Sequence, residues 1–317
     1  MPTPVQLDAR HDRPLSNIAV AAFSDTQEYI ADLLLPPVPV GSESDEYYTI
    51  DKAAWLAIHD TRRSRKTPAN AIEFEVSSDR YACKNYALRE CNAKEDLANA
   101  DRALQLRETS ALNIVEALQR DKELRVANLV TSVSNVGSGV VLSGTSLWSD
   151  FVNSSPLSDV TTGHAFIRQS TGLLANTAVI DADTLAVVRR HPELLDLYKY
   201  TAGGQLDMSQ LAEAFGVERI LVGKGVYNQG NLGQSASMAN IWGNNLLLAH
   251  VRPGVSLKTR TLGLQMRWRP AGIPSDMAVV RYDDPDPGAK AEFVDAGYYG
   301  DEKIVGSELG YLINTTL

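Results

Sequence analysis

Residues 96–132, DLANADRALQLRETSALNIVEALQRDKELRVANLVTS, carry the clearest helical pattern in the 317-residue chain. Apolar side chains recur there close to the spacing of one helical face, and Asp96 can begin the helix. The positions that follow this spacing are Leu104, Ala111, Ile114, Val115, Leu118, Val126 and Leu129. At about 1.5 Å per residue, a helix of about 30 residues would be roughly 45 Å long. The sequence therefore predicts an amphipathic helix that is unusually long for a compact domain.

Two strand-like segments precede this helix, with a charged stretch between them. EYYTID (residues 46–51) and AIEFEVSSDRYAC (residues 71–83) both favour β-structure, and apolar residues alternate in the second. The stretch that separates them, HDTRRSRKTPAN (residues 59–70), contains the cations Arg62, Arg63, Arg65 and Lys66. The pattern predicts a protruding hairpin with a basic tip. A hairpin in a monomeric protein would usually have a shorter tip.

Residues 1–45 are typical of an arm rather than of a domain. A short amphipathic helix is predicted at Ser24–Leu35, with Asp25 and Glu28 in its first turn. The proline-rich stretch LPPVPVG (residues 35–41) then favours an extended path, because proline lacks a backbone donor. Such a segment buries little surface on itself. We therefore expect it to lie on another surface, from this chain or from a neighbour.

Helical patterns alternate with short apolar strands in residues 150–250, which is typical of a compact α/β unit. A helix is predicted to begin at Asp159 or Thr161 and to end before Gly172, and a second is interrupted at Pro192. A small helix is expected between Asp207 and Gly216, and the predicted buried strands are residues 176–181, 219–223 and 244–251. Residues 251–317 return to strand patterning, separated by proline and glycine.

Gly223-Lys224-Gly225 follows an apolar strand, as the glycine-rich turn of a phosphate-binding loop does. The motif G-x-x-x-x-G-K-[ST] is absent, because Gly225 stands where a serine or threonine would hold magnesium. A glycine-rich and polar stretch follows instead of a helix. We interpret Ile220–Val222 as a strand of the α/β unit and Trp242 as a packing anchor. Gly223 and Gly225 are expected to let the chain leave the strand sharply, through positive φ.

The titratable residues show no pattern for catalysis, metal binding or a cofactor. No histidine pairs with another at metal-ligand spacing; the five are His11, His59, His164, His191 and His250. His191, beside Pro192, is interpreted as a turn or capping residue. Cys83 and Cys91 fit no metal signature and are expected to be inert thiols. We therefore predict no catalytic residue, no metal, no cofactor and no enzymatic activity.

The net charge and the hydropathy of the chain further limit the classes of partner that we expect. The formal net charge of −9 argues against a nucleic-acid-binding face as the main surface. No apolar stretch approaches the roughly 20 residues that cross a bilayer. The N-terminus also lacks the basic start and apolar core of a signal peptide. We expect no membrane partner and synthesis in the cytoplasm.

The order of arm, protruding hairpin, long helix, α/β unit and final β layer resembles the major capsid proteins of tailed phages. These proteins share the Hong Kong-type capsid fold. Residues 23–40, FSDTQEYIADLLLPPVPV, resemble the family's N-terminal arm. Residues 60–101 are similar to its extended loop and the start of its spine helix. Residues 164–200, 211–228 and 237–251 resemble its axial domain, and the likeness covers about residues 20–317.

The resemblance implies an α+β chain in five parts. They are the N-terminal arm (residues 1–45), the extended loop (46–90), the peripheral domain with the spine helix (91–150), the axial domain (151–255), and the return to the peripheral or axial β layer (256–317). The archetype of the family begins with a long helical scaffolding domain, whereas only about 45 residues precede the loop here. The resemblance therefore implies a separate scaffolding protein, or none.

The implied function is that of a major capsid subunit. Copies would form pentamers and hexamers of an icosahedral head and enclose double-stranded DNA without sequence-specific contact. The implied location is the virion, after synthesis in the host cytoplasm. Besides the chain itself, the partners would be a scaffolding protein and a portal protein, with room for a decoration protein. The alternative is the shell protein of an encapsulin-like nanocompartment.

The resemblance also suggests where subunits meet. The arm and the hairpin would be buried on neighbouring subunits, with an intersubunit contact at Trp55, Arg62, Arg63, Arg65 and Lys66. A solvated hairpin end is the simpler interpretation of these cations. A nucleic-acid patch fits them less well, because the rest of the chain is acidic. A loop toward a capsomer axis is expected at Gly230, Asn231 and Gly233.

Overall fold

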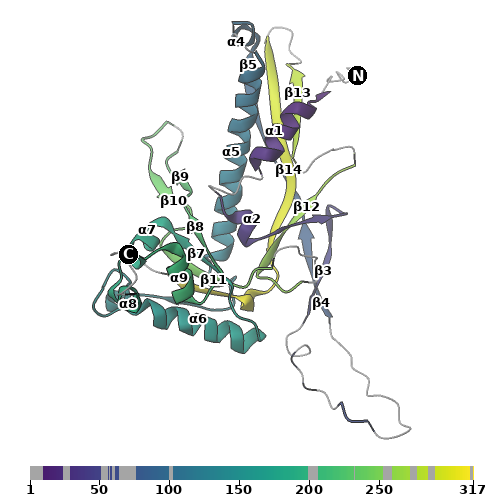
Figure 1. Ribbon diagram of the computed structural model, residues 1–317. Coiled ribbons are helices and arrows are strands. Elements are labelled where there is room, and N and C mark those ends of the chain that lie inside the picture. The colour runs from purple at the N-terminus through teal and green to yellow at the C-terminus, as the bar shows by residue number, and fades with distance from the viewer. Residues whose placement is uncertain are drawn as a thin grey trace.

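Helix α5 (Ala103–Val130) forms the spine of the computed structural model and follows the short helix α4 (Lys94–Asn99) (Figure 1). The long helix predicted from the sequence is therefore confirmed, and α4 occupies the stretch where Asp96 was expected to begin it. The structure describes residues 10–23, 29–50, 56, 58, 61–63, 76–99, 103–198, 206–231, 233–252, 259–271, 277–284, 290–314 and 317.

A six-stranded sheet, counted over the described residues, lies along α5, and we call it the peripheral sheet (Figure 1). Its path runs β1-β13-β14-β12-β2, and β5 pairs with β14. The bounds are β1 (Arg10–His11), β2 (Pro37–Val40), β5 (Lys84–Ala93), β12 (Gly263–Trp268), β13 (Ala278–Asp283) and β14 (Ala291–Ile304). Strand β14 is antiparallel to β5, β12 and β13, so Ala296 stands opposite both Leu88 and Val279.

Helix α1 (Arg13–Phe23) packs with α5 on one face of this sheet. The buried side chains between them are Leu15, Ala19, Phe23, Ala111, Ile114, Val115, Leu118, Val279, Val294 and Tyr298. Of the predicted helix at Ser24–Leu35, residues 24–28 lie outside the described residues, and the described part contains one helical turn, α2 (Ala31–Leu34), whereas α1 lies upstream of the prediction. Helix α1 is favoured by apolar residues four apart and by Asp12, whose Oδ1 accepts the Leu15 N–H at 3.2 Å.

A second, five-stranded sheet within the described residues has the order β6-β15-β11-β7-β8, and we call it the axial sheet. Its strands are β6 (Gly139–Val141), β7 (Thr177–Asp181), β8 (Arg219–Gly223), β11 (Asn245–Ala249) and β15 (Gly310–Asn314). The three buried strands predicted in residues 150–250 are β7, β8 and β11, and they are confirmed. Strand β15, from the C-terminal segment, lies inside the sheet, where it pairs with β11 on one side and with β6 on the other.

Helices cover one face of the axial sheet. They are α6 (Pro156–Thr171), α7 (Ala182–Val188), α8 (Pro192–Leu197) and α9 (Met208–Phe215), with single 3₁₀ turns at Gly144–Ser146 and Ser307–Leu309. Helix α6 begins at Pro156 rather than at Asp159 or Thr161, because a proline in the first turn needs no backbone donor. It ends at Gly172 as predicted, with φ of 73°. Helix α9 is capped by Asp207 and ends at Gly216, also as predicted.

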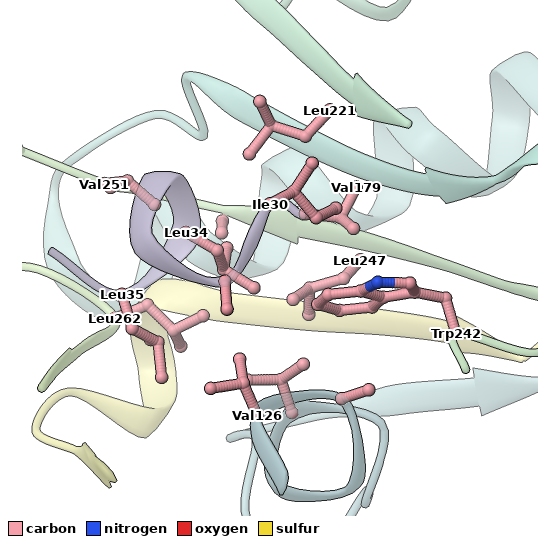
Figure 2. Close-up of a cluster of buried hydrophobic side chains, with 14 of the residues drawn as sticks. Ile30, Leu34, Leu35, Val126, Val179, Leu221, Trp242, Leu247, Val251 and Leu262 are labelled. Atoms are coloured by element: carbon pink, nitrogen blue, oxygen red, sulfur yellow. The ribbon is translucent and has the colours of Figure 1, made fainter. Parts of the chain in front are cut away.

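The two sheets meet around the segment that holds α2 (Figure 2). Figure 2 shows Ile30, Leu34 and Leu35 between Leu221 of the axial sheet and Val126 of α5, and all five are buried. Residues 29–35 therefore lie on their own chain, the first of the two surfaces expected for the arm, and their apolar side chains fill a gap between two parts of it. Burial of the rest of the arm on neighbouring subunits stays a prediction.

Two pairs of antiparallel strands extend away from the two packed sheets. The strands predicted on either side of the basic tip are observed as β3 (Ser44–Ile50) and β4 (Val76–Ala82), which pair antiparallel. A smaller hairpin, β9 (Val226–Asn228) and β10 (Met238–Asn240), projects from the axial part beside β8 (Figure 1). The sequence pattern showed only a glycine-rich and polar stretch there, because strands of three residues are too short to give a clear alternation.

Gly223 and Gly225 do not have positive φ, so that expectation is wrong. Both are instead sites of close approach. A Cβ on Gly223 would lie 2.2 Å from Cδ1 of Trp242, and a Cβ on Gly225 would lie 2.8 Å from Cδ1 of Ile241. Trp242 is buried, which confirms it as a packing anchor. Of the glycines that resembled a phosphate loop, Gly223 lets Trp242 lie against the strand and Gly225 leaves room for Ile241.

Candidate assembly surfaces

The β3–β4 ribbon is fixed to the peripheral sheet at its base. Tyr47 and Tyr81 are buried there with Leu264 and Met266 of β12. The Tyr47 hydroxyl donates to Oδ2 of Asp79 at 2.7 Å. Burial, together with this bond and the Asp79 charge, raises the pKa of Tyr47. The ribbon therefore starts from a buried base on the face of the sheet opposite α5.

The basic tip is described only in part. Arg62 and Arg63 are exposed, whereas Trp55, Arg65 and Lys66 lie outside the described residues. The predicted intersubunit contact at these five residues therefore stays a prediction. The two cysteines are free, and burial raises the pKa of the Cys83 thiol to about 11, which suppresses the reactive thiolate.

The β9–β10 hairpin contains the residues predicted for a capsomer axis. Oδ1 of Asn228 accepts the N–H groups of Gly230 at 3.0 Å and of Ser237 at 2.8 Å, which closes the loop. The carbonyl of Asn231 accepts the Gln234 N–H at 3.0 Å. Gly233 has φ of 90°, where a side chain would be strained. These hydrogen bonds connect the two ends of the loop between the two strands.

Two apolar side chains, Val226 and Met238, are exposed on one face of this hairpin. Directly paired residues of an antiparallel ribbon share a face, so Val226, Asn228, Met238 and Asn240 lie on one side and Tyr227 on the other. Tyr227 packs toward the cluster of Figure 2. Val226 is 45% exposed and Met238 is 65% exposed. This face of the hairpin thus exposes two apolar side chains beside Asn228 and Asn240.

Arg125 ties the spine helix to the peripheral sheet. Its Nη2 donates to the Tyr298 hydroxyl at 2.7 Å and to Oε1 of Glu302 at 3.0 Å, both on β14. The guanidinium also lies over the Tyr86 ring of β5, 3.7 Å from its centroid, and pairs with Asp121 one turn earlier. A single side chain of α5 therefore contacts two neighbouring strands.

Buried charged side chains also lie between α5 and the segment that holds α2, and the sequence analysis did not predict them. Nζ of Lys122 lies 2.8 Å from Oδ2 of Asp32 and 4.0 Å from the centroid of the Phe23 ring. Burial lowers the pKa of Lys122, although Asp32 acts in the opposite direction. Arg267 of β12 stands over the Tyr298 ring at 4.4 Å. The only sequence signal was the charge of Lys122 and Glu123 on an otherwise apolar helix face.

His191 has the capping role that the sequence predicted. It precedes α8, and its Nδ1 accepts the Glu193 N–H at 3.3 Å while Nε2 lies 3.0 Å from the Ser154 hydroxyl. Burial lowers the pKa of His191.

Across the described residues, no three His, Cys, Asp or Glu side chains gather as a metal site would require. In the same residues, no helix is long and apolar enough to cross a membrane.

The chain is similar in sequence to two phage proteins over most of its length. It is 27% identical over 317 residues to the major capsid protein of Pseudomonas phage JBD67, covering 96% of this chain and 97% of that protein. It is also 27% identical over 252 residues to the major capsid protein of Burkholderia phage BcepMu, covering 76% of each. No family model matches the chain.

Solved structures resemble the whole chain as well. A phage-related protein of Bordetella bronchiseptica has a TM-score of 0.76 at 23% identity and covers 96% of both chains. The mature capsid of bacteriophage PhiM1 has a TM-score of 0.57 at 10% identity, covering 92% of this chain and 89% of that one. The SrpI encapsulin of Synechococcus elongatus has a TM-score of 0.50 at 11% identity, with 92% and 88% coverage.

Proposed function

We propose that this chain, which has the Hong Kong-type capsid fold and resembles phage major capsid proteins, is the major capsid subunit of a phage head. In this proposal, copies assemble into pentamers and hexamers of an icosahedral shell around double-stranded DNA. The observation that carries it is the likeness to the JBD67 capsid protein along 96% of the chain. A structural role without catalysis follows from the same relatives.

An encapsulin-like shell is the second candidate. The SrpI encapsulin shares the fold, but at 11% identity the likeness concerns the fold alone. The two sequence relatives are both phage capsid proteins, which favours the phage head. The contents of the particles separate the candidates, because an encapsulin would enclose protein cargo instead of DNA.

We further propose that the basic tip is an intersubunit contact. Arg62, Arg63, Arg65 and Lys66 would pair with carboxylates of a neighbouring copy, with Trp55 packing beside them. The buried base formed by Tyr47 and Tyr81, and the exposure of Arg62 and Arg63, support this assignment. Planar guanidinium groups suit paired contacts with carboxylates.

The β9–β10 hairpin is proposed to face a capsomer axis through Gly230, Asn231 and Gly233. Its projection from the axial part and its exposed Val226 and Met238 support a contact with another copy. A scaffolding protein, a portal protein and a decoration protein remain proposed partners. The five-part division at residues 45, 90, 150 and 255 is likewise proposed as the functional division of the chain.

Electron microscopy of the expressed chain tests the main proposal. We expect closed icosahedral shells with pentameric and hexameric capsomers, from the chain alone or after co-expression with a scaffolding protein. Particles purified from the native host should contain double-stranded DNA. A chain that stays monomeric in both preparations, by analytical ultracentrifugation, would overturn the proposal. Shells filled with a protein cargo would favour the encapsulin alternative.

A further inference from the structure

Residues 29–35, which we call the strap, lie between the spine helix and the axial sheet (Figure 2). Ile30, Ala31, Leu34 and Leu35 are at most 4% exposed and share one cluster with α5 and the axial sheet. The strap is therefore a spacer between the two parts, and its position affects how they sit against each other.

Glu123 of α5 holds the strap through its backbone. Oε1 accepts the Ile30 N–H at 3.1 Å, and Oε2 accepts the Ala31 N–H at 2.8 Å. Oε1 also accepts the indole N–H of Trp242 at 2.7 Å. Trp242 lies against β8 at Gly223, so one carboxylate joins the spine helix, the strap and the axial part. All three groups that contact the Glu123 carboxylate are N–H donors, and an ionised carboxylate can only accept hydrogen bonds.

Other elements hold neighbouring strap atoms. Lys122 pairs with Asp32, and Nη2 of Arg219 on β8 donates to the Leu33 carbonyl at 3.1 Å. Nε2 of Gln265 on β12 donates to the Ala31 carbonyl at 3.2 Å. Helix, axial sheet and peripheral sheet therefore each bind the polar backbone or side chains of the same short segment.

A buried charge is a costly way to stabilise such a junction. Burial raises the pKa of Glu123, against the opposing effect of its hydrogen bonds with Ile30, Trp242 and Ala31. Apolar side chains of similar volume often stabilise a core as well or better. Apolar packing alone, however, tolerates small slides of a segment. Two oxygens bound to two successive N–H groups fix the strap in a single register.

We propose that the strap is a conformational joint and that Glu123 and Trp242 lock its register. Locking the strap fixes the orientation of the axial sheet relative to α5. Release of the carboxylate would let the two parts take several orientations without unfolding either sheet. In the assembled shell, the lock would restrict the angle between the axial sheet and α5, and so the range of shell curvature that a subunit fits. This last step rests on the proposed function.

The test uses Trp242→Phe, which keeps a ring but removes the donor, and Glu123→Gln, which places an amide NH₂ among donors. Glu116→Gln, on the exposed side of the same helix, is the control. Hydrogen exchange of the Ile30 and Ala31 amides should be at least about 10-fold faster in both lock variants and unchanged in the control. Unchanged exchange in Trp242→Phe would overturn the lock, even if Glu123→Gln did not fold.

A distance measurement tests the joint itself. Spin labels at Asn113→Cys on α5 and Gln169→Cys on α6, in a Cys91→Ser background, report the orientation of the two parts. The distance distribution should broaden in Trp242→Phe and stay narrow in Glu116→Gln. An equally narrow distribution in all variants would refute the joint. Both measurements use the unassembled chain, so a failure of the proposed shell function would appear separately, as the absence of particles.

Discussion

Gly223 lies so close to Trp242 that a Cβ on the glycine would stand 2.2 Å from Cδ1 and 2.5 Å from Cγ of the indole. Trp242 is only 3% exposed, so it has no free space into which to move. The same indole donates to Glu123. A side chain at position 223 would therefore disturb both the edge of the axial sheet and the contact with the spine helix.

Gly223→Ala should lower the free energy of unfolding by about 1–3 kcal/mol or more, because the added methyl overpacks a filled site. Urea unfolding of the unassembled chain measures this change. Gly41→Ala is the matched control, since a Cβ there meets no atom within 4 Å. It should change stability by less than about 0.5 kcal/mol. Equal effects of the two substitutions would contradict the close-approach explanation.

Arg125→Lys should destabilise the chain by about 1–3 kcal/mol, because lysine cannot stack on Tyr86 while bonding Tyr298 and Glu302. Arg120→Lys serves as the control, since Arg120 makes an exposed pair with Glu116. Exposed helix pairs contribute about 0.3–0.5 kcal/mol. Thermal unfolding should separate the two variants clearly. Similar melting temperatures would show that the Arg125 cluster contributes no more than the surface pair.

Reversing the charge of Arg62, Arg63, Arg65 and Lys66 to glutamate should weaken assembly while the subunit stays folded. Like charges would then face the carboxylates proposed on the neighbouring copy. Sedimentation measures the fraction of chain in shells, and circular dichroism of the unassembled variant checks its fold. Normal shell yield and stability in the reversed variant would rule out the basic tip as an intersubunit contact.

Stability should fall as the pH drops through the ordinary histidine value of 6.5, partly because of His191. Burial lowers the pKa of His191 in the folded chain, so as the pH falls the unfolded chain binds a proton there at a higher pH than the folded chain does. Proton binding then stabilises the unfolded chain and lowers the free energy of unfolding. His191→Asn keeps a residue that caps helices well and does not titrate. The difference in Tm between about pH 7.5 and about pH 5.5 should be smaller in this variant. An equal difference would mean that other groups cause the acid sensitivity.

The long helix and the α/β unit could be predicted because their signals are local. Gly172 and Gly216 end their helices as the sequence indicated, and His191 caps α8 beside Pro192. Helix α1 also carried a local signal, the spacing of Leu15, Ala19 and Phe23, which was overlooked in a segment interpreted as an arm.

The rest depends on partners that are distant in sequence. The donors to Glu123 lie 93, 92 and 119 residues away, at Ile30, Ala31 and Trp242. No periodicity in the sequence predicts that residues so far apart along the chain will lie in contact. Gly223 was misinterpreted for the same reason, because the group that demands a glycine there is Trp242, which becomes a neighbour only after the chain has folded back. The order of the peripheral strands around β14 is likewise a property of long-range pairing.

Strands β14 and β15 follow each other along the chain with only the short turn at Ser307–Leu309 between them. The first is central to the peripheral sheet, and the second lies inside the axial sheet. A force applied to one sheet therefore reaches the other through covalent backbone as well as through packed side chains. In the proposed shell, internal pressure would be carried along this segment as tension. Such a path can bear load even while the side chains around it rearrange.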